Sequence, residues 1–371
     1  MDTPGNQATE ACPTATSPTF HSRGPLSQRL LIALAGRPSA EAPELADYLG
    51  DIERSLATTA DVLRDGDLQL TLFMLYGLFY GDVGDVEDGW EWHPVTLAAR
   101  AAIEERFERE LRERVQVPSL PATEAEAVAA ALFRLTGKES GPSLARFIAQ
   151  RATANQLVEY VIHRSVYTLK EADPHSWAIP RLTGRPKAAL VEIQADEYGG
   201  GRADRMHSVI FARTMRGLGL DSRYGQYVDQ VSALTLASMN MMSMFGLNRR
   251  LRGAIAGHLA AFEMTSSIPN RLIGNGFRRL GFGSDVTDYF DEHVEADAVH
   301  EQIAARDLAG CLAEDEPALL ADIFFGASAC LAVDGLAGQE VLAAWTSGRS
   351  SLRVPLTPLA AAASTLTPSI P

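Results

Sequence analysis

The sequence predicts an all-α protein built as a helical bundle. Nearly every segment between the two ends of the chain repeats apolar side chains at a helical spacing. Segments in which β-branched and polar residues alternate between turn residues, as strands require, are almost absent. The 371 residues, of which 46% are hydrophobic, can bury a large core. We therefore expect helices packed on one another, around an interior that facing helices can line with metal ligands.

The expected helices have short connections, and capping or turn residues mark several of their ends. Thr123 begins the T-E-A-E pattern of a capping box, and Pro94 and Pro186 suit a first helical turn. Gly217 and Gly246 suit helix ends. In chain order the expected helices cover residues 42–58, 67–80, 94–115, 123–136, 142–169, 186–198, 203–218, 224–245, 248–265, 285–312 and 316–346.

The two ends of the chain are expected to be tails without a fixed structure. Residues 1–25 mix Pro, Thr, Ser, Gly and Ala with almost no large apolar side chains, and residues 347–371 repeat this composition. Such segments cannot bury enough apolar surface to offset the entropy cost of ordering the chain. Leu352 and its apolar neighbours are the part of the second tail that can dock loosely.

Charge, cysteine content and the N-terminal sequence favour a soluble, cytoplasmic protein. The net charge is −14, and acidic residues are interspersed with basic ones, which disfavours nucleic acid and anionic membranes as partners. Cys12, Cys311 and Cys330 lie far apart, so neither a disulfide framework nor a thiolate metal site is expected. The N-terminus lacks the basic start and apolar stretch of a signal peptide.

A metal-binding pattern lies in the segment 291–300. It spaces His293, Asp297 and His300 as H-x3-D-x2-H. At about 100° per residue, these three side chains fall within roughly 60° of arc on one helix face. Two imidazoles and a carboxylate suit iron, manganese or zinc better than calcium or magnesium. One helix cannot supply all the ligands of a two-metal site, so other helices must contribute.

Glu197 and His207 form a second candidate pair, although they stand ten residues apart. In a straight helix that separation is about 15 Å, too far for ligands of adjacent metals. The glycines at 199–201 weaken a helix, so we expect a break within residues 198–203 that turns Glu197 toward His207. Asp204 lies three residues before His207 and remains an alternative to Glu197.

Glu263 is the third candidate, because it stands in an apolar helical segment, residues 259–264. A carboxylate buried there without a partner is costly, so it requires a metal, a base or access to solvent. Metal ligation is the simplest of these answers. His258 lies about 140° away around the same helix and is expected to be a structural histidine.

Taken together, these motifs resemble a known family. The blocks DPHSWAIPRL at 173–182 and VEIQADEYG at 191–199, the E-x9-H pair, the glutamate in AFEMT and the H-x3-D-x2-H helix resemble the iron-containing redox enzymes. These belong to the haem-oxygenase-like diiron oxidase and oxygenase superfamily. The resemblance implies a seven-helix core at 151–346, with residues 26–150 as a helical extension packed on it. The metal ligands that it implies are Glu197, His207, Glu263, His293, Asp297 and His300.

The resemblance also implies a chemistry. Two iron ions, with Glu263 as their bridging ligand, would use dioxygen as co-substrate and form a peroxo-diiron(III) species that oxidises a small organic substrate. An amine or amino acid of specialised metabolism is the first expectation, since Arg249, Arg250 and Arg252 could receive a carboxylate. These arginines are more simply explained as a basic helix surface.

Two other functions stay open at this point. One is a fatty-acid decarboxylating or desaturating diiron oxidase. The other is a non-catalytic, haem-oxygenase-like protein that binds a small ligand, in which the polar helix face is merely solvated. The expected partners are a small-molecule substrate, and a homodimer and an external electron donor are further options, whereas no nucleic acid or membrane partner is expected.

Overall fold

The computed structural model describes residues 20–39, 42–137 and 141–355, without the side chains of residues 295–298. Every regular element in these residues is helical and none is a strand, which confirms the all-α prediction. The α-helices are α1 (Pro25–Leu34), α2 (Tyr48–Thr58), α3 (Gly66–Tyr80), α4 (Pro94–Arg114), α5 (Ala125–Thr136), α6 (Leu144–Gln150), α7 (Ala154–Thr168), α8 (Asp173–Ser176), α9 (Gly184–Glu197), α10 (His207–Gly217), α11 (Ala233–Leu247), α12 (Arg252–Met264), α13 (Ser267–Arg279), α14 (Ser284–Gln302), α15 (Cys311–Asp315) and α16 (Leu320–Thr346).

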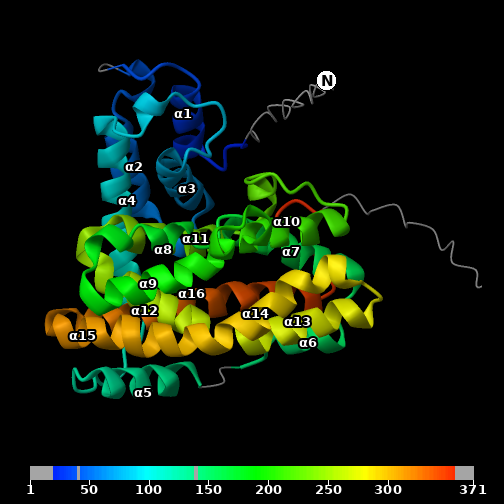
Figure 1. Cartoon of the computed structure of the whole chain (residues 1–371). Helices are drawn as coiled ribbons and strands as arrows, with labels where there is room; N and C mark the ends of the chain where they lie inside the picture. The colour runs from blue at the N-terminus through cyan, green and yellow to red at the C-terminus, as the bar shows by residue number, and fades with distance from the viewer. Residues whose placement is uncertain (1–19, 40–41, 138–140, 356–371) are drawn as a thin grey trace, which may run out of the picture.

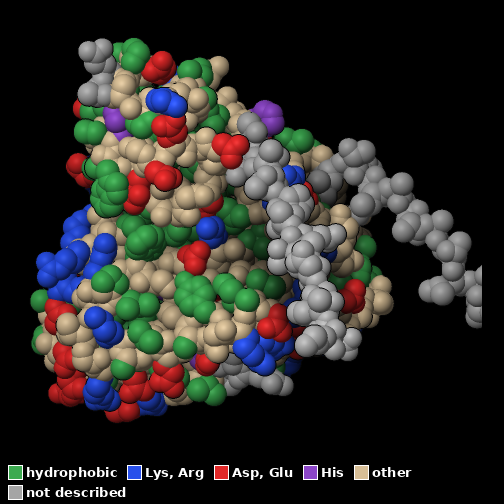
Figure 2. Space-filling view, turned by 45° about the horizontal axis from the view of Figure 1, so that its top comes forward, with side chains coloured by type: hydrophobic (Ala, Val, Ile, Leu, Met, Phe, Trp, Pro, Cys, Tyr) green, Lys and Arg blue, Asp and Glu red, His purple; other side chains and the backbone are tan. Residues whose placement is uncertain are grey.

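The N-terminal helices pack on the rest of the bundle. Figure 1 shows α1, α2 and α3 together at one end of the molecule and α5 along the opposite side. α3 packs on α11, and α5 packs on α12 and on the π-helix Ile303–Gly310. One continuous buried apolar cluster contains residues from both regions of the chain. On the face shown in Figure 2, acidic and basic side chains are interspersed.

Two long helices expected from the sequence are interrupted. The segment 142–169 forms α6 and α7, because Thr153 accepts a hydrogen bond from the backbone N–H of Gln156 and caps a new helix. The segment 285–312 is an α-helix up to Gln302 and continues as a π-helix before α15. The predicted capping box at Thr123 does not form, because α5 begins after Glu124 and has no side-chain cap.

Three helices, α1, the four-residue α8 and α13, were not expected from the sequence. Within α13, Pro269, Gly274 and Gly276 disfavour a helix in isolation. Gly276 instead allows close packing, since a Cβ atom there would lie 2.7 Å from the carbonyl oxygen of Ile148 in α6. Contact with the neighbouring helix therefore outweighs the low intrinsic propensity of this segment.

Parts of both predicted tails are described and are folded against the bundle. Arg23 donates hydrogen bonds to the carbonyl oxygens of Val228 and Val231. Near the other end Leu352 is buried, and the hydroxyl group of Ser351 donates to a carboxylate of α7. The other residues assigned to the tails, 1–19 and 356–371, lie outside the described residues.

The segment Pro317–Thr346, which contains α16, is long and apolar enough by length and composition to cross a membrane. Its most apolar window is 61% buried inside the protein, and α16 packs along α12 and α11. Its apolar character is therefore explained by its position in the core of the bundle.

Two glycines set the close approach of α12 and α16. A Cβ atom at Gly257 of α12 would overlap the carbonyl oxygen of Ile323 in α16. A Cβ atom at Gly326 of α16 would overlap the carbonyl oxygen of Ala254 in α12. Because Glu263 belongs to α12, this contact also fixes where its carboxylate lies in the core.

We predict that Gly326→Ala lowers the free energy of unfolding by about 1 to 3 kcal/mol, because the added methyl group must push two packed helices apart. Gly335→Ala is the control on the same helix, since no atom lies within 4 Å of its Cβ position. That variant should be neutral or more stable by up to about 1 kcal/mol. Urea denaturation measures both effects, and equal stabilities of the two variants would contradict the prediction.

Candidate metal centre

Two groups of buried ligand-type side chains lie next to each other in the core. Within each group, one ligand atom of every residue lies within 4.8 Å of the corresponding atoms of the others. Glu197 belongs to both groups and therefore joins them. The first group contains Glu171, Glu197, His207 and His293, and the second contains Glu197, Glu263 and His300.

A break in the helix brings Glu197 and His207 together, as the sequence predicts. α9 ends at Glu197 and α10 begins at His207. Between them Gly199, Gly200 and Gly201 have φ values of 72°, 60° and 81°, a region that glycine adopts without the steric cost of a Cβ atom. At Gly199 a Cβ atom would lie only 2.6 Å from the backbone of residue 205. The turn therefore requires glycine at this position.

The first group places imidazole and carboxylate atoms in direct contact. Nδ1 of His207 lies 2.8 Å from Oε2 of Glu197, but this contact does not have the geometry of a hydrogen bond. His293 donates from Nδ1 to the carbonyl oxygen of Tyr289 at 2.8 Å. Its Nε2 therefore faces Oε1 of Glu171, 3.5 Å away. The ring centres of His207 and His293 lie 4.5 Å apart.

The second group is arranged around His300. Its Nδ1 lies 3.6 Å from Oε2 of Glu263 and 3.7 Å from Oε1 of Glu197. Its Nε2 lies 3.1 Å from Oδ2 of Asp196, which fixes the orientation of the ring. Burial by itself lowers the pKa of His300, but Glu263, Asp196 and Glu197 outweigh burial and raise it to about 9.

The electrostatics of the two groups favour a bound cation. Burial raises the pKa of Glu263, and Glu197 raises it further, while His300 lowers it. Burial also raises the pKa of Glu171, but His293 lowers it below its ordinary value. Three buried carboxylates in so small a volume repel one another and are costly unless positive charge compensates them.

Several buried ligand atoms make no hydrogen bond with the residues that the structure describes, which is the pattern that a metal would complete. These atoms are Oε2 of Glu197 and Nδ1 of both His207 and His300. Buried polar atoms are almost always paired, so such atoms require an explanation. Nitrogen and carboxylate donors in this mixture suit iron. The residues present therefore fit a buried site for iron.

Five of the six predicted ligands, all except Asp297, come together in the core. Asp297 lies on α14 between His293 and His300, but its side chain is outside the described residues. Glu197 belongs to both groups, because it lies at the end of α9, where the chain turns between the two sets of ligands. Glu263, the predicted bridging ligand, belongs to one of them.

Glu171 is the one residue of the two groups that the sequence reasoning missed. It lies between α7 and α8, outside any regular helix, and it is 5% exposed. The hydroxyl group of Tyr289 donates to its two oxygens at 2.8 and 2.9 Å. In the sequence Glu171 follows Lys170 and precedes Asp173, so it has the appearance of a polar surface turn. The signal that could have indicated Glu171 as a site residue was its position two residues before the DPHSWAIPRL block.

The alternatives left open by the sequence lie elsewhere. Asp204 is exposed and belongs to neither group, and Glu192 is exposed on α9. Arg250 and Arg252 form ion pairs, with Glu108 and Glu316 respectively. These arginines therefore belong to a basic helix surface.

Four further buried histidines, His93, His163, His175 and His258, lie outside both groups. His175 and His258 contact each other, with 3.2 Å between Nε2 and Nδ1. Nδ1 of His163 lies 2.9 Å from the hydroxyl oxygen of Thr235. Burial lowers the pKa of His163 and of His175 to about 4, so both are neutral at pH 7. They act as uncharged structural residues, as expected for His258.

Comparisons with known proteins agree with this geometry. The model of the family described as iron-containing redox enzyme matches residues 158–335, which include every residue of the two groups. The chain is also similar to a nitrosourea synthase from Streptomyces achromogenes subsp. streptozoticus, with 29% identity over 147 residues. This match covers 39% of the chain and 31% of that enzyme, so the chain matches less than a third of the length of this relative.

We predict that Glu171→Gln weakens iron binding, because the amide keeps the shape of the side chain and can still accept from Tyr289 but loses the charge that a cation needs. Removing an outer-shell partner of a metal ligand typically weakens metal binding about 10- to 100-fold. Removing the charge of a ligand itself should weaken iron binding at least as much. Anaerobic Fe²⁺ titration measures it. Glu192→Gln removes an exposed acid from α9 and should leave the titration unchanged. Equal affinities of the two variants would exclude Glu171 as a ligand.

We also predict that His163 makes the stability of the protein depend on pH. Its pKa is about 4 in the folded state and about 6.5 when unfolded, so between these values the unfolded chain binds more protons. The contribution to stability is complete above pH 6.5 and falls by roughly 3 kcal/mol as the pH approaches 4. Urea denaturation across this range should show a steeper loss for the native protein than for His163→Gln. Parallel curves would contradict the prediction.

Proposed function

Since the chain belongs to the iron-containing redox enzyme family, we propose that it is a diiron oxidase or oxygenase that uses dioxygen to oxidise a small organic substrate. The observation that carries this proposal is the pair of buried ligand groups that share Glu197. One carboxylate has two oxygen atoms, so Glu197 could serve as a ligand to each of two adjacent metal ions. Iron bound there would supply one-electron and dioxygen chemistry that protein side chains lack.

The chain holds these ligands in place through hydrogen bonds outside the two groups. Tyr289 acts on both sides of the first group, because its hydroxyl group binds Glu171 and its carbonyl oxygen orients His293. Asp196 orients His300 in the second group. Such contacts fix which ring nitrogen faces the metal and thereby tune the site.

The surroundings of the ligands exclude bulk water. The apolar segment around Glu263 is buried on α12, where Leu259 is 3% and Ala260 0% exposed. His293 and His300 are 4% and 1% exposed. A non-catalytic protein in which this helix face is merely solvated does not fit such burial. A dry site also strengthens electrostatic interactions and limits side reactions of reactive species.

The similarity to a nitrosourea synthase favours a nitrogen-containing substrate, such as an amine or an amino acid. A fatty-acid substrate would require a long apolar channel, whereas the cavity that shares Tyr167 with the space between the ligand groups, described below, is small and partly polar. The identity of the relative extends to only part of each chain, so the substrate class is part of the proposal.

We predict that the protein, purified without oxygen and supplied with Fe²⁺, binds about two iron ions per chain and consumes dioxygen afterwards. Glu197→Ala should reduce iron binding at both positions, because both groups contain this carboxylate. His300→Ala should lose about one iron ion, because His300 belongs to one group. Iron analysis after gel filtration measures these stoichiometries. Two tightly bound ions in Glu197→Ala, or none in the native protein, would refute the proposal.

A further inference from the structure

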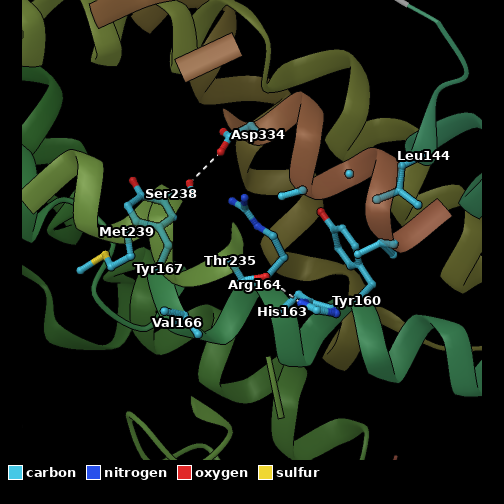
Figure 3. Close-up of a pocket in the computed structure, with 13 residues that line it drawn as sticks. Leu144, Tyr160, His163, Arg164, Val166, Tyr167, Thr235, Ser238, Met239 and Asp334 are labelled. Atoms are coloured by element: carbon cyan, nitrogen blue, oxygen red, sulfur yellow. Dashed lines mark hydrogen bonds between the residues drawn. The ribbon is translucent and has the colours of Figure 1, made fainter. Parts of the chain in front are cut away.

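A cavity lies beside the metal centre, between α7, α11 and α16. Its volume is about 160 Å³. Sites for drug-sized ligands have about 300 to 1,000 Å³, so this cavity suits only a small molecule. Figure 3 shows that charged and polar side chains reach it from all three helices, Arg164 and Tyr160 from α7, Ser238 from α11 and Asp334 from α16. The remaining lining is mostly apolar.

Arg164 is the unusual member of this lining. Its guanidinium group forms no ion pair and no hydrogen bond with any residue that the structure describes, and it lies 5.7 and 5.8 Å from the ring centres of Tyr167 and Phe262. Burial by itself lowers the pKa of Arg164, but Tyr160 and nearby acidic groups raise it above its ordinary value, so the charge is kept. A partly buried cation without a bonded anion is costly, and a planar fork of donors suits a carboxylate.

A carboxyl group and hydroxyl groups line other parts of the same cavity. Asp334 accepts a hydrogen bond of 2.7 Å from Ser238, which leaves one of its oxygens available. The phenol group of Tyr160 makes no hydrogen bond within the described part of the chain. The cavity therefore offers both a cation and an acid without an ion pair between them, which matches a small zwitterion.

The cavity and the metal centre share one wall. Tyr167 lines the cavity and also the small space bordered by Glu171, Glu197, Glu263 and His293. Its ring contacts that of Phe262 edge to face, with centres 5.1 Å apart, and Phe262 directly precedes Glu263. A molecule in the cavity is therefore separated from the ligand groups by a single layer of side chains.

We propose that this cavity binds the substrate, a small amino acid whose carboxylate pairs with Arg164 and whose ammonium group pairs with Asp334. That the bound amino acid is the substrate rests on the proposed oxidase function. Its binding in the cavity does not require iron. Arg164 and Asp334 are specificity-determining residues in this assignment, and the apolar lining contacts the side chain of the amino acid.

Calorimetric titration with three probes of matched chain length tests this assignment. L-norleucine carries both charges, hexanoate only the carboxylate and hexylamine only the ammonium group. Norleucine should bind most tightly to the native protein, with and without Fe²⁺. Arg164→Gln should weaken the binding of norleucine and of hexanoate about 10- to 100-fold, which is the range for losing a charge-assisted hydrogen bond. Asp334→Asn should weaken the binding of norleucine and leave the affinity for hexanoate unchanged.

Two controls separate binding from folding and from the iron site. Arg249→Gln changes an arginine outside the cavity and should bind all three probes like the native protein. Arg164→Lys keeps the positive charge and should recover part of the hexanoate affinity lost in Arg164→Gln. The thermal unfolding temperature and iron content of Arg164→Gln report whether the variant is folded and loaded.

Each outcome decides one of the two proposals. If Arg164→Gln is folded and binds norleucine as tightly as the native protein does, or if no carboxylate probe binds the native protein, the cavity assignment is wrong and the diiron proposal stands. If the native protein binds norleucine through Arg164 but takes up no iron, the cavity is a ligand site and the oxidase proposal fails.

Discussion

The burial of several carboxylates and imidazoles in one small volume is the constraint on which the rest of the structure depends. Glu197 lies at its centre, because both ligand groups contain it. Charged groups in a dry interior are tolerated only where opposite charge and hydrogen bonds compensate them. The helices around the site must therefore supply an exact geometry as well as an apolar shell, and small departures from regular helix provide much of that geometry.

These departures lie next to the ligands along the chain. The glycines at 199–201 turn the chain between Glu197 and His207. Glu171 belongs to the connection between α7 and α8, and a π-helix begins three residues after His300. Irregular backbone of this kind is common at functional sites because it points side chains in directions that a continuous α-helix cannot reach. Elsewhere the helices stay regular and close-packed, as where Gly257 lets α12 meet α16.

The metal centre and the neighbouring cavity differ in how their buried charges are arranged. The ligand groups gather negative charge, whereas in the cavity the guanidinium of Arg164 forms no ion pair with the carboxyl group of Asp334. Tyr167 stands between the two regions and contacts both. An excess of acid suits metal cations, and separated opposite charges suit a zwitterion. Under the two proposals, this arrangement would place a polar organic molecule close to an iron site without mixing their charges.

The sequence by itself determined the fold class, the helix break after Glu197 and five residues that meet in the core, because helical spacing and glycine conformation are local properties. Only the tertiary structure decided that Glu171 joins them, that Glu197 is shared, and that α13 is helical. It also revealed Arg164 as a partly buried cation without a bonded anion among the described residues. These features depend on contacts between segments far apart in the chain, and such contacts leave no periodic signal in the sequence.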